Sequence, residues 1–104
     1  MSLKDTILGA NDTKLEPVSV PEWNATVYVK VMSLEEGTAI DRIAEGDDAL
    51  ALAKRATFII RDEQGNRIFT EADAPALAKK SVKALRRIID AHAKLNAPED
   101  PGKN

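Results

Sequence analysis

The sequence predicts a small α+β domain that is mostly helical, with one N-terminal β-hairpin at about residues 16–31 packed against four to five short helices. Three observations predict this fold class. Residues 26–31 alternate between polar and apolar side chains with the period of two that a half-buried strand requires. Ser33 and Glu36 form the S-x-x-E pattern of a helix start. Residues 81–95 carry apolar side chains at steps of three and four, which is typical of an amphipathic helix.

The composition is that of one globular domain. The chain has 104 residues, of which 43% are hydrophobic and 31% are charged, and its formal net charge is -2. No apolar run approaches the ~20 residues of a membrane span, and the N-terminal residues lack the apolar stretch of a signal peptide. Cysteine is absent, which excludes disulfides, thiolate nucleophiles and cysteine-based metal sites and fits a reducing compartment.

A short helix is expected at residues 3–10 with Ser2 as its N-cap. So short a helix is marginal alone and has to dock, either onto its own domain or onto a neighbouring subunit. The hairpin follows, with arms at 16–20 and 26–32 and a connection at 21–25. Pro17 and Pro21 cannot donate to a ladder, so the first arm should be an edge strand. The apolar face of the hairpin needs a cover and consists of Val18, Val20, Val27, Val29 and Val31.

The middle of the chain predicts two helices. The first runs from 34 to about 44, with Gly37 inside it and an apolar stripe of Leu34, Ala39, Ile40, Ile43 and Ala44. Asp47 and Asp48 then cap a helix at 49 to about 59, with an apolar face of Leu52, Ala56, Ile59 and Ile60. Its end has two interpretations. The helix stops in a turn, or residues 57–61 and 66–69 form a second small hairpin.

Thr70 and Asp73 mark the start of a short helix that is expected to reach about Lys80. The last helix should cover 81–95, with an apolar face of Val82, Leu85, Ile88, Ile89, His92 and Leu95. Residues 96–104 contain two prolines and no large apolar side chain, so we expect a flexible tail or linker. The predicted organisation is a single domain at 1–95 followed by this tail.

No residue pattern predicts chemistry on a substrate. His92 is the only histidine and lies on the apolar face of the last helix, where a packed residue is expected, and it leaves no zinc-ligand set. We therefore predict no catalytic, cofactor-binding or metal-binding residue and no enzyme activity. Trp23 could anchor a partner or fold over its own hairpin as a lid on the core. Tyr28, on the polar side of its strand, could touch a neighbour.

Opposite charges are segregated along the chain. Residues 79–87 are basic and residues 35–48 are acidic. The basic run is either a solvated helix face or one half of a head-to-tail contact, in which the acidic region of one subunit meets the basic helix of the next. Heterologous contacts of this kind produce rings or open spirals. The candidate partner or self-association residues are Trp23, Tyr28, Glu35, Glu36, Asp41, Lys83, Arg86 and Arg87.

Three stretches in this order carry a resemblance to a known family. They are the Val-Pro-Glu-Trp and Val-Tyr-Val-Lys hairpin at 20–30, the segment Asp-Glu-Gln-Gly-Asn-Arg-Ile-Phe at 62–69, and Thr-Glu-Ala-Asp at 70–73 leading to a last helix that ends Lys-Leu-Asn at 94–96. Their order and spacing, over roughly residues 3–96, resemble the tail assembly chaperones of long-tailed, siphovirus-type bacteriophages and prophages.

The resemblance implies a protein that binds the tape measure protein, a long helical polypeptide, keeps it soluble and helps the tail tube protein polymerise around it. It implies a homo-oligomer without cofactors, located in the cytoplasm of the infected or lysogenic bacterial host and absent from the mature virion. Family members commonly have an extended form, made by translational frameshifting, that recruits tube subunits. Pro101-Gly102-Lys103 can be encoded by a slippery heptamer, so a frameshift there is a hypothesis that the gene sequence would test.

Two other functions are compatible with the sequence. A small nucleic-acid-binding regulator would use the basic last helix, although no aromatic residues are interleaved with its charges and no known module is present. A structural head–tail component would be found in purified particles. No Gly-rich phosphate loop is present, so an assembly chaperone of this sequence would act by stoichiometric binding, without ATP hydrolysis.

Overall fold

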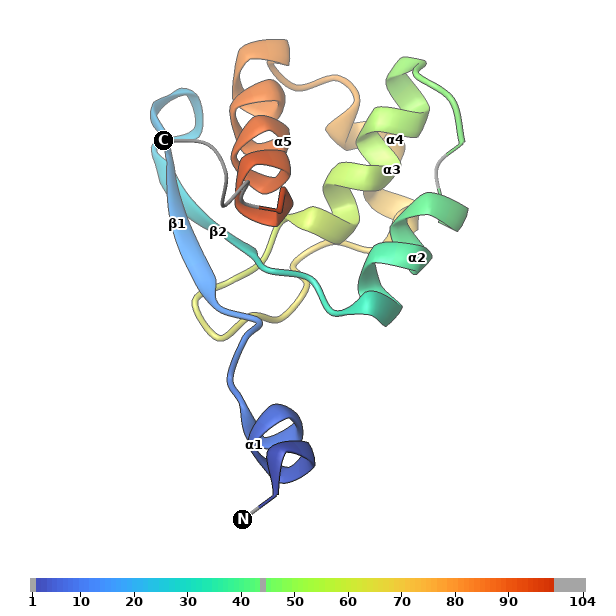
Figure 1. Ribbon diagram of the computed structural model, residues 1–104. Helices are drawn as coiled ribbons and strands as arrows, with labels where there is room; N and C mark the ends of the chain where they lie inside the picture. The colour runs from blue at the N-terminus through green and yellow to red at the C-terminus, as the bar shows by residue number, and fades with distance from the viewer. Residues whose placement is uncertain (1, 44, 99–104) are drawn as a thin grey trace.

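The computed structural model describes residues 2–43 and 45–98, and the predicted fold class is confirmed: a mostly helical α+β domain with an N-terminal hairpin (Figure 1). Ala44 of the predicted second-helix stripe and the hypothetical frameshift site at 101–103 lie outside the described residues. In chain order, the elements are α1 (Leu3–Gly9), β1 (Leu15–Val20), the 3₁₀ turn η1 (Pro21–Trp23), β2 (Ala25–Lys30), α2 (Leu34–Ile43), α3 (Ala49–Ile59), the 3₁₀ turn η2 (Glu71–Asp73), α4 (Ala74–Leu77) and α5 (Val82–Asn96).

The antiparallel hairpin places Val18 opposite Val27 and Val20 opposite Ala25. Asn24 turns the chain between the strands in the left-handed conformation, with a φ of 49° that asparagine tolerates better than most residues. The side of the hairpin that carries Val20 and Val29 is fully buried, and α5 packs across both strands (Figure 1). Thus the hairpin obtains the cover that a two-stranded sheet needs from its own chain.

Side chains cap the helices largely where the sequence predicts. Ser2 Oγ accepts from Asp5 N at 3.1 Å, Asp48 Oδ1 accepts from Ala51 N at 2.8 Å, and Ser81 Oγ accepts from Ala84 N at 3.3 Å. The Ser33–Glu36 box is complete, because Ser33 Oγ accepts from Glu36 N at 3.2 Å and Glu36 Oε1 accepts from Ser33 N at 2.9 Å. At the start of η2, Asp73 accepts from Thr70 N at 2.8 Å. These caps explain why the short helices begin where they do.

The core lies where α3, α4 and α5 meet the hairpin. Its largest fully buried apolar side chains are Ile60, Ile88, Val20 and Val29, and Ile59 is only 2% exposed. Several of the buried core positions on α3, α4 and α5 are alanines, and they are Ala53, Ala56, Ala74 and Ala84. Small side chains let short helices pack tightly without leaving cavities.

Three apolar residues predicted to face the core do not. Leu34 is 85% exposed and Val82 is 61% exposed; each occupies the first position of its helix and lines an open pocket. Val31 is only half-buried and lies outside the core, because β2 ends at Lys30 and the Val31 N–H donates to Lys14 O. In α2, Ile40 is the buried residue.

Residues 57–69, which the sequence allows to be either a helix end with a turn or a second hairpin, combine features of both. The helix interpretation holds through Ile59, so the arm at 57–61 is not a strand. Arg61 then forms isolated bridges with Tyr28 and with Arg67. Its backbone exchanges both hydrogen bonds with Tyr28, and across the predicted hairpin Asp62 N donates to Asn66 O at 2.9 Å. The turn between them closes at Gly65, whose φ of 87° favours glycine.

Two helix ends differ from the prediction. The short helix α4 ends at Leu77, before Lys80, and α5 continues to Asn96, one residue past the predicted end. Asn96 extends the helix because its side chain is bound to the end of β2.

Helix α1 stands apart from the rest of the molecule (Figure 1). None of its residues is buried, and Leu3, Ile7 and Leu8 are 74%, 61% and 74% exposed. The molecule is accordingly elongated, with extents of 50 × 29 × 29 Å. Of the two docking modes that the sequence allows, docking onto its own domain does not occur in this structure.

Candidate functional site

An apolar groove lies between α3 and α5. Its volume is about 190 Å³, and its walls are mainly aliphatic: Ala49, Leu52, Ala53, Ala78, Val82, Leu85 and Ile89, with Lys80 and Arg86 at the rim. Leu52, Leu85 and Ile89 are half-buried, so their exposed surface forms part of the wall. A groove with an apolar floor and two cations at its edge can accept large apolar side chains from a partner that carries acids beside them.

A second cleft lies at the end of the molecule formed by η1 and α4. Its volume is about 480 Å³, and it is lined by Glu22, Trp23, Phe69, Asp73, Ala76, Leu77 and Lys80. Trp23 is half-buried and packs against the core, as the lid interpretation predicts, yet it also forms part of the cleft wall. The cleft therefore combines an aromatic floor with two acidic side chains and one lysine.

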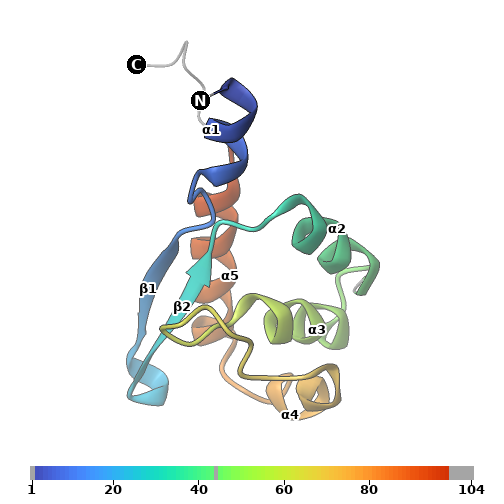
Figure 2. The ribbon, with the colours of Figure 1, turned by 90° about the horizontal axis from the view of Figure 1, so that it is seen from below.

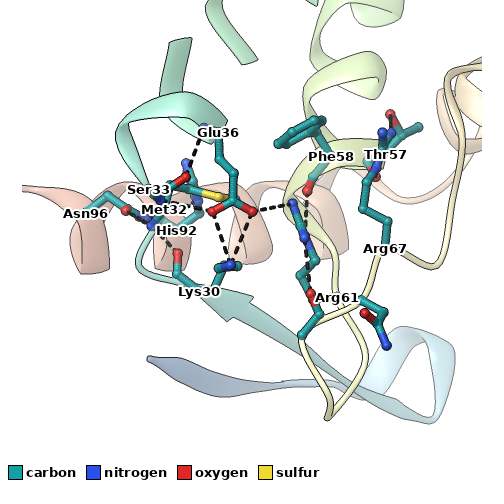
Figure 3. A network of polar contacts seen from close by, with 12 residues as sticks. Lys30, Met32, Ser33, Glu36, Thr57, Phe58, Arg61, Arg67, His92 and Asn96 are labelled. Atoms are coloured by element: carbon teal, nitrogen blue, oxygen red, sulfur yellow. Dashed lines mark hydrogen bonds and ion pairs between the residues drawn. The ribbon is translucent and has the colours of Figure 1, made fainter. Parts of the chain in front are cut away.

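A polar network joins α2 to the rest of the molecule (Figure 3). The Glu36 carboxylate pairs with Lys30 Nζ at 3.1 Å and with Arg61 Nη2 at 3.5 Å, in addition to its bond with Ser33 N. Burial alone would raise the pKa of Glu36, but the hydrogen bonds from Ser33 and Lys30 lower it below the ordinary value of 4.5. Glu36 thus holds the start of α2 against β2 and the loop that follows α3.

Arg61 is the charged residue that sequence reasoning missed. It is only 5% exposed, and its Nε and Nη1 donate to Phe58 O at 3.0 Å and to Gly65 O at 3.1 Å. Its guanidinium lies 5.1 Å from the centre of the Phe58 ring, and that of Arg67 lies 4.6 Å from the same ring (Figure 3). Burial lowers the pKa of Arg61, and the charge of Glu36 opposes this shift. Phe58 and Gly65 lie within four residues of Arg61, but its charge partner Glu36 comes from α2, and no sequence pattern links the two.

Asn96 and His92 form the other half of the network. Asn96 Oδ1 accepts from Met32 N at 2.7 Å, and Asn96 Nδ2 donates to Lys30 O at 3.1 Å (Figure 3). His92 Nδ1 lies 3.3 Å from Asn96 Nδ2, in position to accept a hydrogen bond when it is deprotonated. Burial lowers the pKa of His92, and the charge of Arg61 lowers it further. The histidine is thus packed into the structure, as its place on the helix predicts.

The predicted contact residues fall into two groups. Glu36 and Arg87 make ion pairs within the chain. Those of Glu36 are described above, and Arg87 pairs with Glu22 through both terminal guanidinium nitrogens, with Nη2 and Oε2 3.0 Å apart. This ion pair lowers the pKa of Glu22 and raises that of Arg87. Tyr28 is half-buried, and its backbone exchanges hydrogen bonds with Arg61. The remaining charged candidates are exposed, and they are Glu35, Asp41, Lys83 and Arg86.

These four exposed charges do not meet within one molecule. Glu35 and Asp41 lie on α2, and Lys83 and Arg86 lie on the first half of α5. Among the residues that the structure describes, no group of acidic and histidine side chains could hold a metal ion. Within the same residues, no helix is long and apolar enough to cross a membrane.

Comparisons with known proteins place the chain in a family. A family model described as "Phage tail assembly chaperone, TAC" matches residues 10–92. Among solved structures, the tail assembly chaperone of bacteriophage HK97 is similar in fold, with a TM-score of 0.67 and 15% sequence identity, over 93% of this chain and 96% of that one. No curated protein matches the sequence. Because the family model covers most of the chain, this protein belongs to the phage tail assembly chaperone family.

Proposed function

We propose that this chain binds the tape measure protein of its phage, keeps it soluble and promotes polymerisation of the tail tube around it, without enzymatic chemistry. The observation that carries the proposal is the family match over residues 10–92 of a chain that also presents an open apolar groove between α3 and α5. A tape measure protein is a long helix with apolar stripes, and helix-in-groove docking is a common way to cover such a stripe.

The groove suits side chains that project from one face of a client helix. Its volume of about 190 Å³ admits large aliphatic side chains but not a whole helix, so the client would lie across α3 and α5. Lys80 and Arg86 at the rim would pair with acidic residues that flank the apolar stripe of the client. One such contact is small, so firm coating needs many copies bound side by side.

We further propose that the copies self-associate head to tail as a ring or spiral. The exposed acids Glu35 and Asp41 of one copy would meet the exposed cations Lys83 and Arg86 of the next. None of these four residues has an ion pair within the described chain, so their charges are available to a neighbour. A contact between two different faces generates repeated assemblies of the kind that coats a filament.

The setting of this function is also a proposal. The protein would act in the cytoplasm of the infected or lysogenic bacterium and would be absent from finished particles. A form extended by translational frameshifting would recruit the tail tube protein. The gene sequence around codons 101–103 and mass spectrometry of purified virions test these two statements directly. A slippery run with an overlapping frame supports the first, and detection of the chain in virions contradicts the second.

Co-expression with the tape measure protein tests the main proposal. The soluble fraction of the tape measure protein should rise when this chain is present, and the two should co-purify. Val82→Asp should abolish this effect, because it places a charge in the wall of the groove at a position that is 61% exposed. Leu50→Asp is the matched control, since Leu50 is 44% exposed, lies in the first turn of α3 and does not line the groove.

The outcomes separate the competing functions. An insoluble tape measure protein that never co-purifies would contradict the proposal. Salt-dependent retention of the purified chain on DNA, together with no effect on the tape measure protein, would favour a nucleic-acid-binding regulator. Equal loss of client binding in both variants would reject the groove as the docking site.

A further inference from the structure

We propose that α1 of one copy docks into the cleft lined by Trp23, Phe69 and Leu77 of the next copy. This α1–cleft contact is a separate part of the head-to-tail interface, and the inference rests on the self-association proposed above.

Helix α1 is well formed but unsupported. Ser2 caps it, yet none of its seven residues is buried, and Leu3 and Ile7 present adjacent apolar side chains one turn apart. A helix of this length is marginal in water unless its apolar face is covered. The face therefore needs an occupant, and the structure places none of the chain's own described residues over it.

The cleft of the same chain is out of reach. Helix α1 lies at one end of a molecule with a longest extent of 50 Å, and both views place η1 and α4, which form the cleft, at the opposite end (Figures 1 and 2). A surface at one end that fits a cleft at the other joins identical copies in series. The acidic helix α2 also lies towards the α1 end in both views, which is consistent with the charged head-to-tail contact.

The charges at the rim select this cleft over the groove between α3 and α5. Lys4 lies beside the Leu3–Ile7 face of α1 and makes no ion pair in the described chain. The cleft carries Asp73 beside Lys80, and the charge of its Glu22 is matched by Arg87, whereas both charged residues of the groove are cations. At the cleft, Lys4 can pair with Asp73, whereas at the groove it would meet only cations. The cleft volume of about 480 Å³ accommodates the Leu3 and Ile7 side chains on its aromatic floor.

The first test is the concentration dependence of assembly, measured by analytical ultracentrifugation on the full chain. Ile7→Asp should raise the concentration for half-assembly by at least about tenfold, because it puts a charge into an apolar cleft. Thermal unfolding of the monomer should be unchanged, since Ile7 is 61% exposed and buries nothing in its own chain. Leu50→Asp, outside both partners of the contact, should assemble like the parent chain.

The second test exchanges charges between the two surfaces. Lys4→Glu places an acid against Asp73, and Ala76→Lys places a further cation against Lys4, so each variant alone should assemble several-fold more weakly. Ala76 is exposed and lines the cleft, so its replacement leaves the core intact. An equimolar mixture of the two variants should regain the assembly of the parent, because each cleft then meets an α1 of suitable charge.

Each outcome has a distinct meaning. A parent chain that stays monomeric at every concentration overturns both this inference and the proposed self-association. A parent that assembles, with Ile7→Asp assembling equally well, overturns only the α1–cleft contact. Failure of the mixture to regain assembly has the same consequence. Recovery in the mixture supports a contact between copies and excludes an α1 that folds back onto its own chain.

Discussion

Asn96 and Met32 are 64 positions apart in the chain, and Asn96 Oδ1 accepts a hydrogen bond from Met32 N at 2.7 Å. The side-chain nitrogen of Asn96 also donates to Lys30 O at 3.1 Å. The last residue of α5 thus makes the hydrogen bonds that a neighbouring strand would otherwise make at the end of β2. These two hydrogen bonds fix the position of the end of α5 relative to the hairpin that the helix covers.

Asn96→Ala should lower the free energy of unfolding by about 1–2 kcal/mol, because it leaves two half-buried backbone groups without their partner. Lys94→Ala is the matched control on the same helix, since Lys94 is exposed, and it should change stability by less than about 0.5 kcal/mol. Urea denaturation of the three proteins measures both values. Equal stability of Asn96→Ala and the parent would show that the bridge contributes nothing.

Glu36→Ala should destabilise the domain by about 2–3 kcal/mol, because it removes the carboxylate that faces the buried Arg61. Glu35→Ala, one residue away and exposed, should be nearly neutral. Chemical denaturation compares the pair. Similar effects for both substitutions would show that the ion pairs drawn in Figure 3 are not important for stability.

Acidification should weaken the fold in two steps with assignable causes. Burial lowers the pKa of His92 below 6.5, so its contribution is complete above that pH and is lost as the pH falls through its folded-state pKa. The lowered pKa of Glu36 gives a second loss beginning below 4.5. The melting temperature of the parent should fall in both pH ranges. His92→Gln should lack the fall below pH 6.5, and Glu36→Gln should show a smaller fall below pH 4.5. If His92→Gln loses as much stability below pH 6.5 as the parent does, that loss belongs to other titratable groups.

Self-association should weaken with salt if the segregated charges form part of the contact. Raising salt from low concentration to about 0.5 M should reduce assembly size, because exposed charge pairs are screened. The double variant Lys83→Glu/Arg86→Glu should assemble poorly at low salt, whereas Lys94→Glu on the same helix should assemble normally. Light scattering measures the assembly size. A size that is independent of salt would remove these charges from the interface.

Local signals in the sequence predicted much of the fold. The cap at Ser33 and Glu36 depends on side chains three residues apart, so it could be found without knowing what α2 packs against. The alternation around Val27 and Val29 likewise needs only a buried face and a solvated face. Features of this kind are set by neighbours in the chain.

The contacts that hold the candidate surfaces in place could not be predicted in the same way. Arg61 bonds Phe58 and Gly65 within its own stretch of chain, but the acid that faces it, Glu36, comes from α2, and a lone arginine before a turn gives no sign of this. The helical spacing of Leu34 and Val82 indicated core positions, but each begins its helix beyond the packed layer. Which apolar residues stay exposed depends on where helices end relative to one another, and this is a property of the assembled fold.

Site-specific cross-linking to the tape measure protein tests the central claim most directly. The chain has no cysteine, so a single Val82→Cys substitution places one photoreactive label at the groove between α3 and α5, and Glu63→Cys places one in the exposed loop after α3. Illumination of the co-purified complex should cross-link the tape measure protein through position 82 and not through position 63. Cross-linking through position 63 alone, or no complex to illuminate, would contradict the account.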